Sequence, residues 1–248
     1  MTIQRRVHQQ SAYILHHRPF RDSSQILDII SRDHGKLALV ARGSRAAKSR
    51  VRGVLRPFMP LALSWVQRTD LGTLTGAEVR GAPLSLTGDA LLSGYYVNEL
   101  LLHFVHRYDP QPDIFQLYER TIVSLAGTDD VAPKLRQFEI ALMRLLGYAL
   151  NLDHEAGSER PLEVQCYYEY RFEQGPVPVD RSAGAMVFSG AQLAAIRSER
   201  FGEPEVLRAA TRLLKRVIAF HLGGKELKSR KVLVDLYRAR INDETLGP

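Results

Sequence analysis

The residues best suited to chemistry form one basic run between Arg42 and Arg56. Six of these residues are Lys or Arg, none is Asp or Glu, and Gly and Ser lie between the cations. Small residues let backbone amides approach phosphate groups, and long cations neutralise them. The run therefore favours binding of a polyanion, with a steep dependence on salt because each neutralised phosphate releases counterions. The six cations are Arg42, Arg45, Lys48, Arg50, Arg52 and Arg56.

The simpler interpretation of this run is a solvated loop that keeps the chain in solution. An anionic membrane is disfavoured as the partner because no apolar face accompanies the charges. Two further residues extend the nucleic-acid hypothesis, namely Lys36, and Phe20 as a platform on which bases could stack. A second basic cluster is either the solvated start of a helix or an extension of the binding path. It consists of Lys225, Lys228, Arg230 and Lys231.

The net charge of +7 is spread unevenly over the 248 residues. Residues 1–80 carry 14 Lys and Arg against 5 Asp and Glu, a net of +9. Residues 81–207 carry 10 against 18, and residues 208–248 carry 10 against 4, so these parts have net charges of −8 and +6. This asymmetry predicts a modular chain whose first part faces a polyanion.

Composition indicates a globular protein of a reducing compartment. The apolar fraction is 45%, and the single cysteine, Cys166, excludes an intramolecular disulfide framework and a Cys-rich metal site. No run approaches the roughly 18 apolar residues of a spanning helix, and the N-terminus does not resemble a signal peptide. We therefore expect a cytoplasmic protein with no membrane partner.

Residue patterns typical of an enzyme are missing from the sequence. It contains no G-x-x-x-x-G-K-[ST], G-x-G-x-x-G or G-x-S-x-G motif. His16 and His17 would point to opposite faces of a strand, and Cys166, among tyrosines, is interpreted as a buried structural thiol. Acids are sparse near the basic run, which argues against a carboxylate–metal nuclease there. We expect no catalytic residue, no cofactor and no bound metal.

Short β-prone runs separated by Gly and Asp turns occupy the first 80 residues. Five strands in this length suit an OB-fold, a five-stranded barrel that binds single strands across an exposed face. Trp65 lies in an apolar alternation and is expected in the barrel core. The expected strands are residues 11–17, 25–31, 36–41, 59–66 and 71–79.

From about Leu86 the apolar period becomes helical. The first helix has Leu91, Tyr95, Leu102 and Val105 along one stripe. Asn98-Glu99 within it is expected to mark its contact with the barrel. Residues 151–189 break the pattern and are expected to form a loop with a hairpin-like insertion. Further helices are expected at residues 113–125, 133–146, 190–198, 204–221 and 229–240.

The predicted fold class is therefore α+β, with an OB-fold over residues 1–80 followed by a mainly helical domain over residues 81–248. We expect the two parts to pack together because no low-complexity linker separates them.

Several segments of the sequence resemble the RecO family of bacterial recombination mediators. They occur in the family's order and span nearly the whole chain, and together they are specific although none is a catalytic fingerprint. The segments are Tyr13–Ser24, Gly35-Lys36, Val40–Arg45, Arg56–Phe58, Gly94–Leu101, Phe138–Leu142, Leu146–Tyr148 and Leu222–Arg230.

The resemblance implies a mediator without enzymatic turnover. Members bind single- and double-stranded DNA, anneal complementary strands and cooperate with RecR and the single-stranded DNA-binding protein SSB to load the RecA recombinase. It also implies a cytoplasmic location at the nucleoid. Because SSB is contacted through its acidic tail, a hydrophobic pocket edged by cations is expected in the helical domain. Arg136, beside Phe138, is the candidate for one of these cations.

One departure from the family concerns zinc. Many relatives carry a four-cysteine site in the insertion, whereas the matching stretch Asn151–Phe172 keeps only Cys166, with His154 nearby. Four ligands cannot be assembled from these residues. The sequence therefore predicts a zinc-free variant whose insertion is held by Tyr and Phe side chains.

Two other function classes stay open beside the favoured one. An RNA-binding OB-fold protein of the translation machinery would share the basic barrel, and a metal-dependent nuclease is the enzymatic alternative. The favoured mechanism is binding, in which Lys36 and the basic run neutralise phosphates of two neighbouring strands and leave the base edges free to pair.

Overall fold

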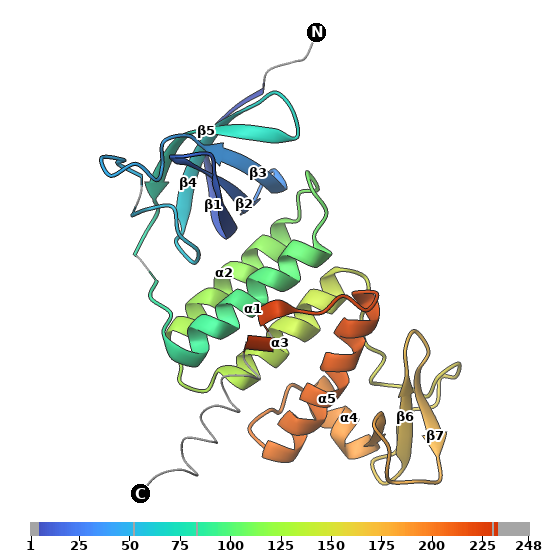
Figure 1. Ribbon diagram of the computed structural model, residues 1–248. Coiled ribbons are helices and arrows are strands. Elements are labelled where there is room, and N and C mark those ends of the chain that lie inside the picture. The colour runs from blue at the N-terminus through green and yellow to red at the C-terminus, as the bar shows by residue number, and fades with distance from the viewer. Residues whose placement is uncertain (1–4, 52, 83, 230, 233–248) are drawn as a thin grey trace, which may run out of the picture. The chain divides into compact units, whose positions relative to one another are not determined.

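The computed structural model describes residues 5–51, 53–82, 84–229, 231 and 232. Contacts divide the chain into two compact units. The barrel unit comprises residues up to Asp129 together with those from Leu227 onward, and the helical unit comprises Asp130–Glu226. Strands β1–β5 and helices α1 and α2 belong to the barrel unit, and α3, β6–β8, α4 and α5 belong to the helical unit (Figure 1).

Five strands close into a barrel in the order β1-β2-β3-β5-β4. Neighbouring strands are antiparallel except for β3 and β5, which run parallel. This arrangement confirms the expected OB-fold. The strands are β1 (Arg5–Phe20), β2 (Ser24–Ser31), β3 (Gly35–Ala41), β4 (Leu61–Gln67) and β5 (Leu71–Val79).

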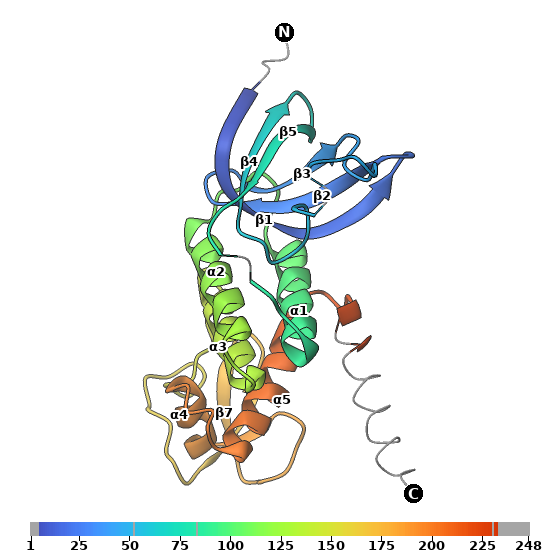
Figure 2. The ribbon, with the colours of Figure 1, turned by 90° about the vertical axis from the view of Figure 1, so that its left-hand side faces the viewer.

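Strand β1 is longer than the expected residues 11–17 at both ends. Its first half pairs with β4 and its second half with β2. Irregularities between Val7 and Gln10 and between Ile14 and His16 let one strand serve both neighbours, and Figure 2 shows the resulting curvature. Pro19 does not end the strand because it lies opposite Gln25 close to the hairpin turn, where a missing N–H is tolerated.

Alternate residues of the strands fill the barrel interior. Leu27 and Ile29 of β2 and Leu37 and Leu39 of β3 belong to one buried cluster with Trp65. The Trp65 side chain is 2% exposed, which confirms its expected place in the core. Residues of opposite parity on β2 and β3 face the outside of the barrel, where Ile26, Ile30, Ala38 and Val40 are nevertheless buried.

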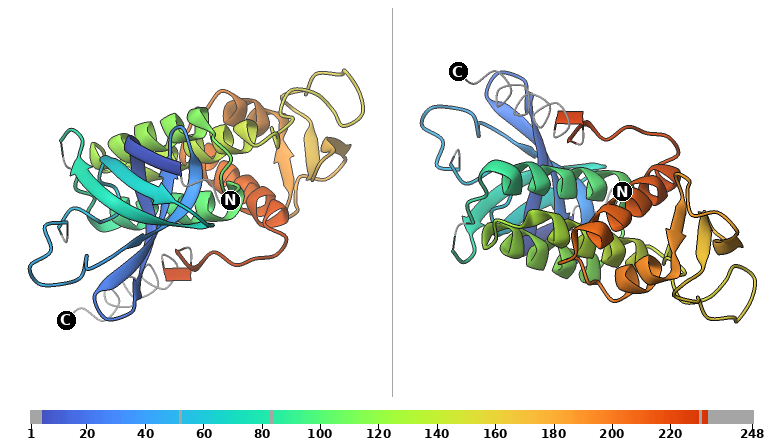
Figure 3. Two further views of the ribbon diagram at one scale, coloured as in Figure 1. Left: turned by 90° about the horizontal axis from the view of Figure 1, so that it is seen from above. Right: turned by 90° about the horizontal axis from the view of Figure 1, so that it is seen from below.

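Helices α1 (Gly88–Phe104) and α2 (Pro112–Ala126) pack side by side within the barrel unit (Figure 3). Asn98 Nδ2 donates a hydrogen bond to the Leu15 carbonyl at 2.8 Å, and Asn98 Oδ1 accepts one from the Tyr118 hydroxyl at 2.8 Å. Asn98 therefore marks the contact of α1 with the barrel, as expected, whereas the Glu99 carboxylate accepts hydrogen bonds from Lys228 and Ser229. Tyr95, on the apolar stripe noted in the sequence, is 44% exposed because α1 buries a different face.

Three helices and a small sheet make up the helical unit. They are α3 (Val131–Leu145), β6 (Tyr167–Arg171), β7 (Gly175–Val179), β8 (Val187–Ser189), α4 (Gly190–Arg197) and α5 (Pro204–His221). Helix α5 has the expected bounds, and α3 begins two residues before Pro133. The insertion contains the expected hairpin, β6–β7, and adds β8 as a third strand on the other side of β6.

Aromatic side chains hold this insertion. Tyr168 and Phe188 are buried, and Phe172 stacks on Phe220 with ring centroids 4.6 Å apart. Cys166 is half-buried, so its interpretation as a buried thiol is wrong; its Sγ lies 3.6 Å from Glu163 Oε2. Within the described ranges, no group of three or more His, Cys, Asp or Glu side chains is placed to hold a metal. No helix of this described part is long and apolar enough to span a membrane.

Candidate nucleic-acid interface

The basic run forms the connection between β3 and β4 and is anchored from inside the barrel. Leu55 and Met59 are buried in the interior cluster, and Val51 and Val54 pack against that cluster. The Leu55 amide donates to the Val51 carbonyl at 3.1 Å, so the segment folds into a short turn. The apolar residues of the connection therefore point inward, which leaves its long polar side chains on the surface. We call residues 42–56 the basic loop.

The cations of the basic loop are exposed. Among the described residues, none of them is ion-paired with a carboxylate. Their charges are therefore available to phosphates. The exposed cations are Arg42, Arg45, Lys48, Arg50 and Arg56, and Arg52 lies outside the described residues.

The β1–β2 hairpin lies directly against the start of the basic loop. The Arg45 amide donates to the Ser23 carbonyl at 2.8 Å, and Arg45 Nη1 donates to the Arg21 carbonyl at 3.4 Å. The Arg21 guanidinium lies over the Phe20 ring, 5.2 Å from its centroid. In OB-folds this hairpin loop and the outer face of β2 and β3 bind oligonucleotides. The structure thus brings Phe20 together with the loop cations.

Phe20 itself is half-buried. It packs against a small apolar cluster formed by Ile26, Ala38 and Val40. These residues alternate with the interior residues of β2 and β3, so the cluster lies on the outside of the barrel. A base could stack only on the part of the Phe20 ring that this cluster leaves free.

Lys36 differs from the loop cations. Its Nζ donates to the Leu102 carbonyl of α1, and its own carbonyl accepts from the Tyr108 amide at 2.9 Å. Desolvation by burial, followed by repulsion from Arg107, lowers the pKa of Lys36 from its ordinary value. This ammonium group joins the barrel to α1 rather than standing free for a phosphate.

Asp28, which is not among the predicted site residues, lies beside two arginines and a histidine. Its carboxylate lies 3.5 Å from His16 Nδ1, 3.3 Å from Arg18 Nη1 and 3.8 Å from Arg107 Nη2. An acid within the apolar run 25–31 was the available signal, because a buried carboxylate requires partners. Asp28 thus neutralises part of the barrel's outer face.

The C-terminal basic cluster begins at a capped turn. The Lys228 and Ser229 amides donate to the Glu99 carboxylate at 2.9 and 2.8 Å, so this acid satisfies amides at a helix start. The helix expected at residues 229–240 begins at Lys228, and its part beyond residue 232 lies outside the described residues. Lys225, Lys228 and Lys231 are exposed, while Arg230 lies outside the described residues.

Arg136 is buried on α3. It is 7% exposed, and its Nη2 donates to Glu139 Oε1 at 2.8 Å. The Arg136 guanidinium is thus ion-paired within α3, and its place at an SSB-tail pocket stays a prediction.

A groove on α5 has the cation-edged character that was expected of the pocket near Arg136. Its volume is about 730 Å³. Ala132 and Leu207 give it an apolar lining, and Arg212 at its edge packs over the Phe188 ring, 4.5 Å from the centroid. The basic edge consists of Arg208, Arg212, Lys215 and Arg216.

Comparisons with known proteins agree with this architecture. The family described as "Recombination protein O N terminal" matches residues 5–82, and the one described as "Recombination protein O C terminal" matches residues 85–231. The chain belongs to the RecO family. The two family matches meet near residue 83. The division into compact units falls elsewhere, after Asp129. The expected domain boundary between residues 80 and 81 therefore stays a prediction.

Individual RecO relatives are similar over nearly their full lengths. "DNA repair protein RecO" of Dechloromonas aromatica is 39% identical over 242 residues, which cover 95% of this chain and 99% of the relative. The protein of the same name from Azoarcus sp. strain BH72 is 41% identical over 240 residues, with the same coverage. That of Nitrosococcus oceani is 41% identical over 234 residues, 94% of this chain and 95% of the relative. The chain is therefore a DNA repair protein of the RecO family.

Proposed function

We propose that this protein binds single- and double-stranded DNA, anneals complementary strands and, with RecR and SSB, promotes RecA loading in recombinational repair at the nucleoid. The basic loop is the observation that carries the DNA-binding part, because its exposed cations lie on an OB-fold without carboxylate partners among the described residues. The roles of RecR and RecA, and the nucleoid location, are supported by the family resemblance.

In this mechanism the protein acts by binding. Loop cations neutralise the phosphates of two strands held close together, which lowers the repulsion between the strands. The contacts are made to the backbone, so the base edges stay free to pair. Phe20 and Arg21 at the hairpin tip would extend the contact onto bases and phosphates of one strand.

The decisive experiment neutralises three loop cations together in Arg45→Gln/Lys48→Gln/Arg50→Gln. Affinity for a single-stranded oligonucleotide should fall, and the slope of log affinity against log salt should flatten by about 2, since each lost phosphate contact to a single strand removes about 0.7. The matched control is Arg160→Gln/Arg181→Gln/Arg200→Gln, which removes the same charge from exposed positions of the helical unit. An unchanged slope in the loop variant rejects the basic loop as the DNA site.

Two assays separate this function from its alternatives. Annealing of matched DNA strands should exceed that of mismatched strands and should persist with RNA as competitor, whereas an RNA-binding protein of the translation machinery would be inhibited by RNA. Incubation of the pure protein with DNA and Mg²⁺ or Mn²⁺ should leave the DNA intact, and intrinsic cleavage would establish the nuclease alternative.

The α5 groove supports the SSB part of the proposal. An apolar lining would accept the aromatic residue that ends the SSB tail, and the surrounding cations would pair with the tail's carboxylates. Arg208→Gln/Lys215→Gln/Arg216→Gln should abolish capture of a tail peptide and leave the salt slope of single-strand binding unchanged. A tail peptide truncated at its C-terminus is the control, and equal capture of both peptides would exclude this site.

A further inference from the structure

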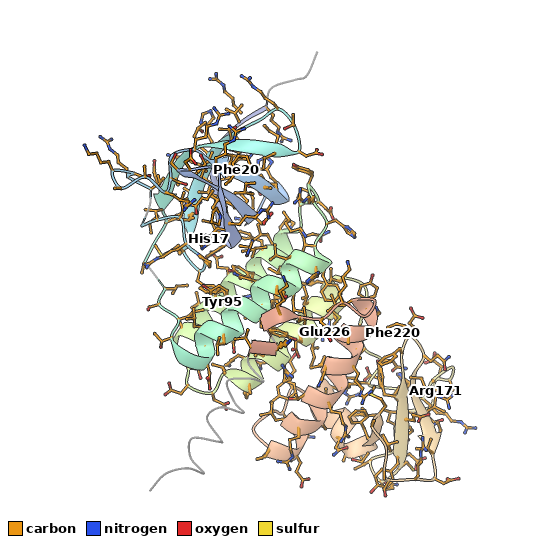
Figure 4. All side chains as sticks on the ribbon, viewed as in Figure 1. His17, Phe20, Tyr95, Arg171, Phe220 and Glu226 are labelled. Atoms are coloured by element: carbon orange, nitrogen blue, oxygen red, sulfur yellow. The ribbon has the colours of Figure 1, made fainter. Side chains whose placement is uncertain are left out.

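A second groove, of about 500 Å³, lies on the barrel unit. Residues of β1, α1 and the C-terminal turn line it, with Leu15, Leu92 and Leu102 among the apolar residues. Of the α1 stripe that the sequence marked as apolar, Tyr95 and Leu102 line this groove. Figure 4 labels Tyr95, which lines this groove from α1.

Tyr95 is fixed at the junction of this groove and the basic loop. Its ring meets the Phe58 ring edge to face, with centroids 5.2 Å apart. Phe58 lies two residues after Arg56, is 5% exposed, and packs so closely on α1 that a Cβ at Gly94 would lie 2.8 Å from its ring. The Tyr95 ring is 44% exposed yet held in place, which are the properties of a stacking platform.

The groove has a lysine at its rim that can pair with an anion. Its ionisable lining residues are His16, Glu99, His103 and Lys228. Glu99 is the single carboxylate among these four, and both of its oxygens accept hydrogen bonds from Lys228 or Ser229. Lys228 is exposed and supplies the positive charge at the rim of the groove.

We propose that this groove binds a nucleotide of single-stranded DNA, with the base stacked on Tyr95 and the backbone phosphate beside Lys228. The inference rests on the proposed function, because the strand would arrive from the basic loop. A strand bound in this way would contact both the basic loop and Lys228. Glu99 is then a positioning residue, because the hydrogen bond that it accepts from the Lys228 amide holds Lys228 at the groove. A nucleotide is favoured over an acidic peptide because Tyr95 packs against Phe58, which follows Arg56 of the basic loop by two residues.

The test measures single-strand binding of Tyr95→Ala across salt concentrations. Loss of one base stack should weaken binding about 10-fold and leave the salt slope unchanged, since no phosphate contact is removed. Tyr95→Phe keeps the ring and should bind as the wild type does. Tyr148→Ala removes a tyrosine of similar exposure, 45%, from the helical unit and should also bind as the wild type does. Quenching of 2-aminopurine in the oligonucleotide should occur with wild type and Tyr95→Phe but not with Tyr95→Ala.

The outcomes separate the inference from the function on which it rests. Failure of the wild type to bind single strands overturns both. If the loop variant flattens the salt slope while Tyr95→Ala binds and quenches as the wild type does, the groove inference is overturned and the proposed function stands. If Tyr95→Phe is as defective as Tyr95→Ala while its thermal unfolding is normal, stacking is also overturned. Loss of acidic-peptide capture with intact DNA binding in Tyr95→Ala would assign the groove to a protein partner instead.

Discussion

The cations of the barrel unit fall into two groups that differ in their surroundings. Those of the basic loop are exposed and lack ion pairs among the described residues, because the loop is anchored by Leu55 and Met59 in the barrel core. Lys36, Arg18 and Arg107 instead have partners, which are the Leu102 carbonyl and the Asp28 carboxylate. The same residue type therefore serves the fold in one place and stays available to a ligand in the other.

Mutations in the two groups of cations should therefore change different properties, stability in one group and DNA affinity in the other. Arg18 lies on β1 beside Asp28, whereas Lys36 and Arg107 form a β-bridge where the start of β3 meets the segment between α1 and α2. Changes at this contact should lower the free energy of unfolding. Changes in the basic loop should lower DNA affinity and its salt dependence with little effect on stability.

The largest expected effect comes from closing the space at Gly35. This residue has φ +66°, and a Cβ there would lie 2.2 Å from the Asp109 carbonyl oxygen. Gly35→Ala should therefore lower the free energy of unfolding by about 3 kcal/mol or more, from backbone strain and overpacking together. Gly43→Ala at the loop has a similar φ of +63° but no atom within 4 Å, and should cost only about 1 kcal/mol. Urea unfolding measures both, and equal losses would contradict the distinction.

A smaller effect is expected from Asp28→Asn, which would convert partnered cations into free ones. Loss of these pairs should lower the free energy of unfolding by about 1 kcal/mol, because the cationic partners are half exposed. The freed charges of Arg18 and Arg107 lie on the barrel surface, so single-strand binding should tighten and its salt slope should steepen by about 1. Asp129→Asn makes the same charge change at an exposed position and should alter neither quantity. Equal slopes for both variants would show that this face does not meet DNA.

Some features of the fold and of the candidate site can be predicted from the sequence, and others cannot. Hydrophobic period and turn residues predict five strands and the bounds of α5, because both signals are local. The length of β1 escapes prediction because its bulges depend on pairing with two separate strands. Exposure of the loop cations follows from a run that is rich in charge and in Gly and Ser. The partly buried position of Lys36 cannot be predicted from the sequence, because its partner is a backbone carbonyl 66 residues away. Arg136 illustrates a missed local signal, since Glu139 stands three residues along the same helix and can pair with it.

The smallest effect concerns how stability depends on pH. Because burial lowers the pKa of Lys36, the unfolded chain holds more protons than the folded chain between that lowered pKa and the ordinary value of 10.5. The free energy of unfolding should therefore gain a contribution that rises with pH in this alkaline window. Lys36→Met removes the contribution, so the wild type's advantage over this variant should grow between about pH 7 and pH 10. Tyrosine ionisation cancels in this comparison because both proteins share it. The free energies of unfolding come from urea titrations at several pH values. If those of the wild type and Lys36→Met change in parallel with pH, the Lys36 ammonium is not desolvated in the folded protein. Lys36 would then not differ from the exposed cations, and the division of the barrel's cations into two groups would be wrong.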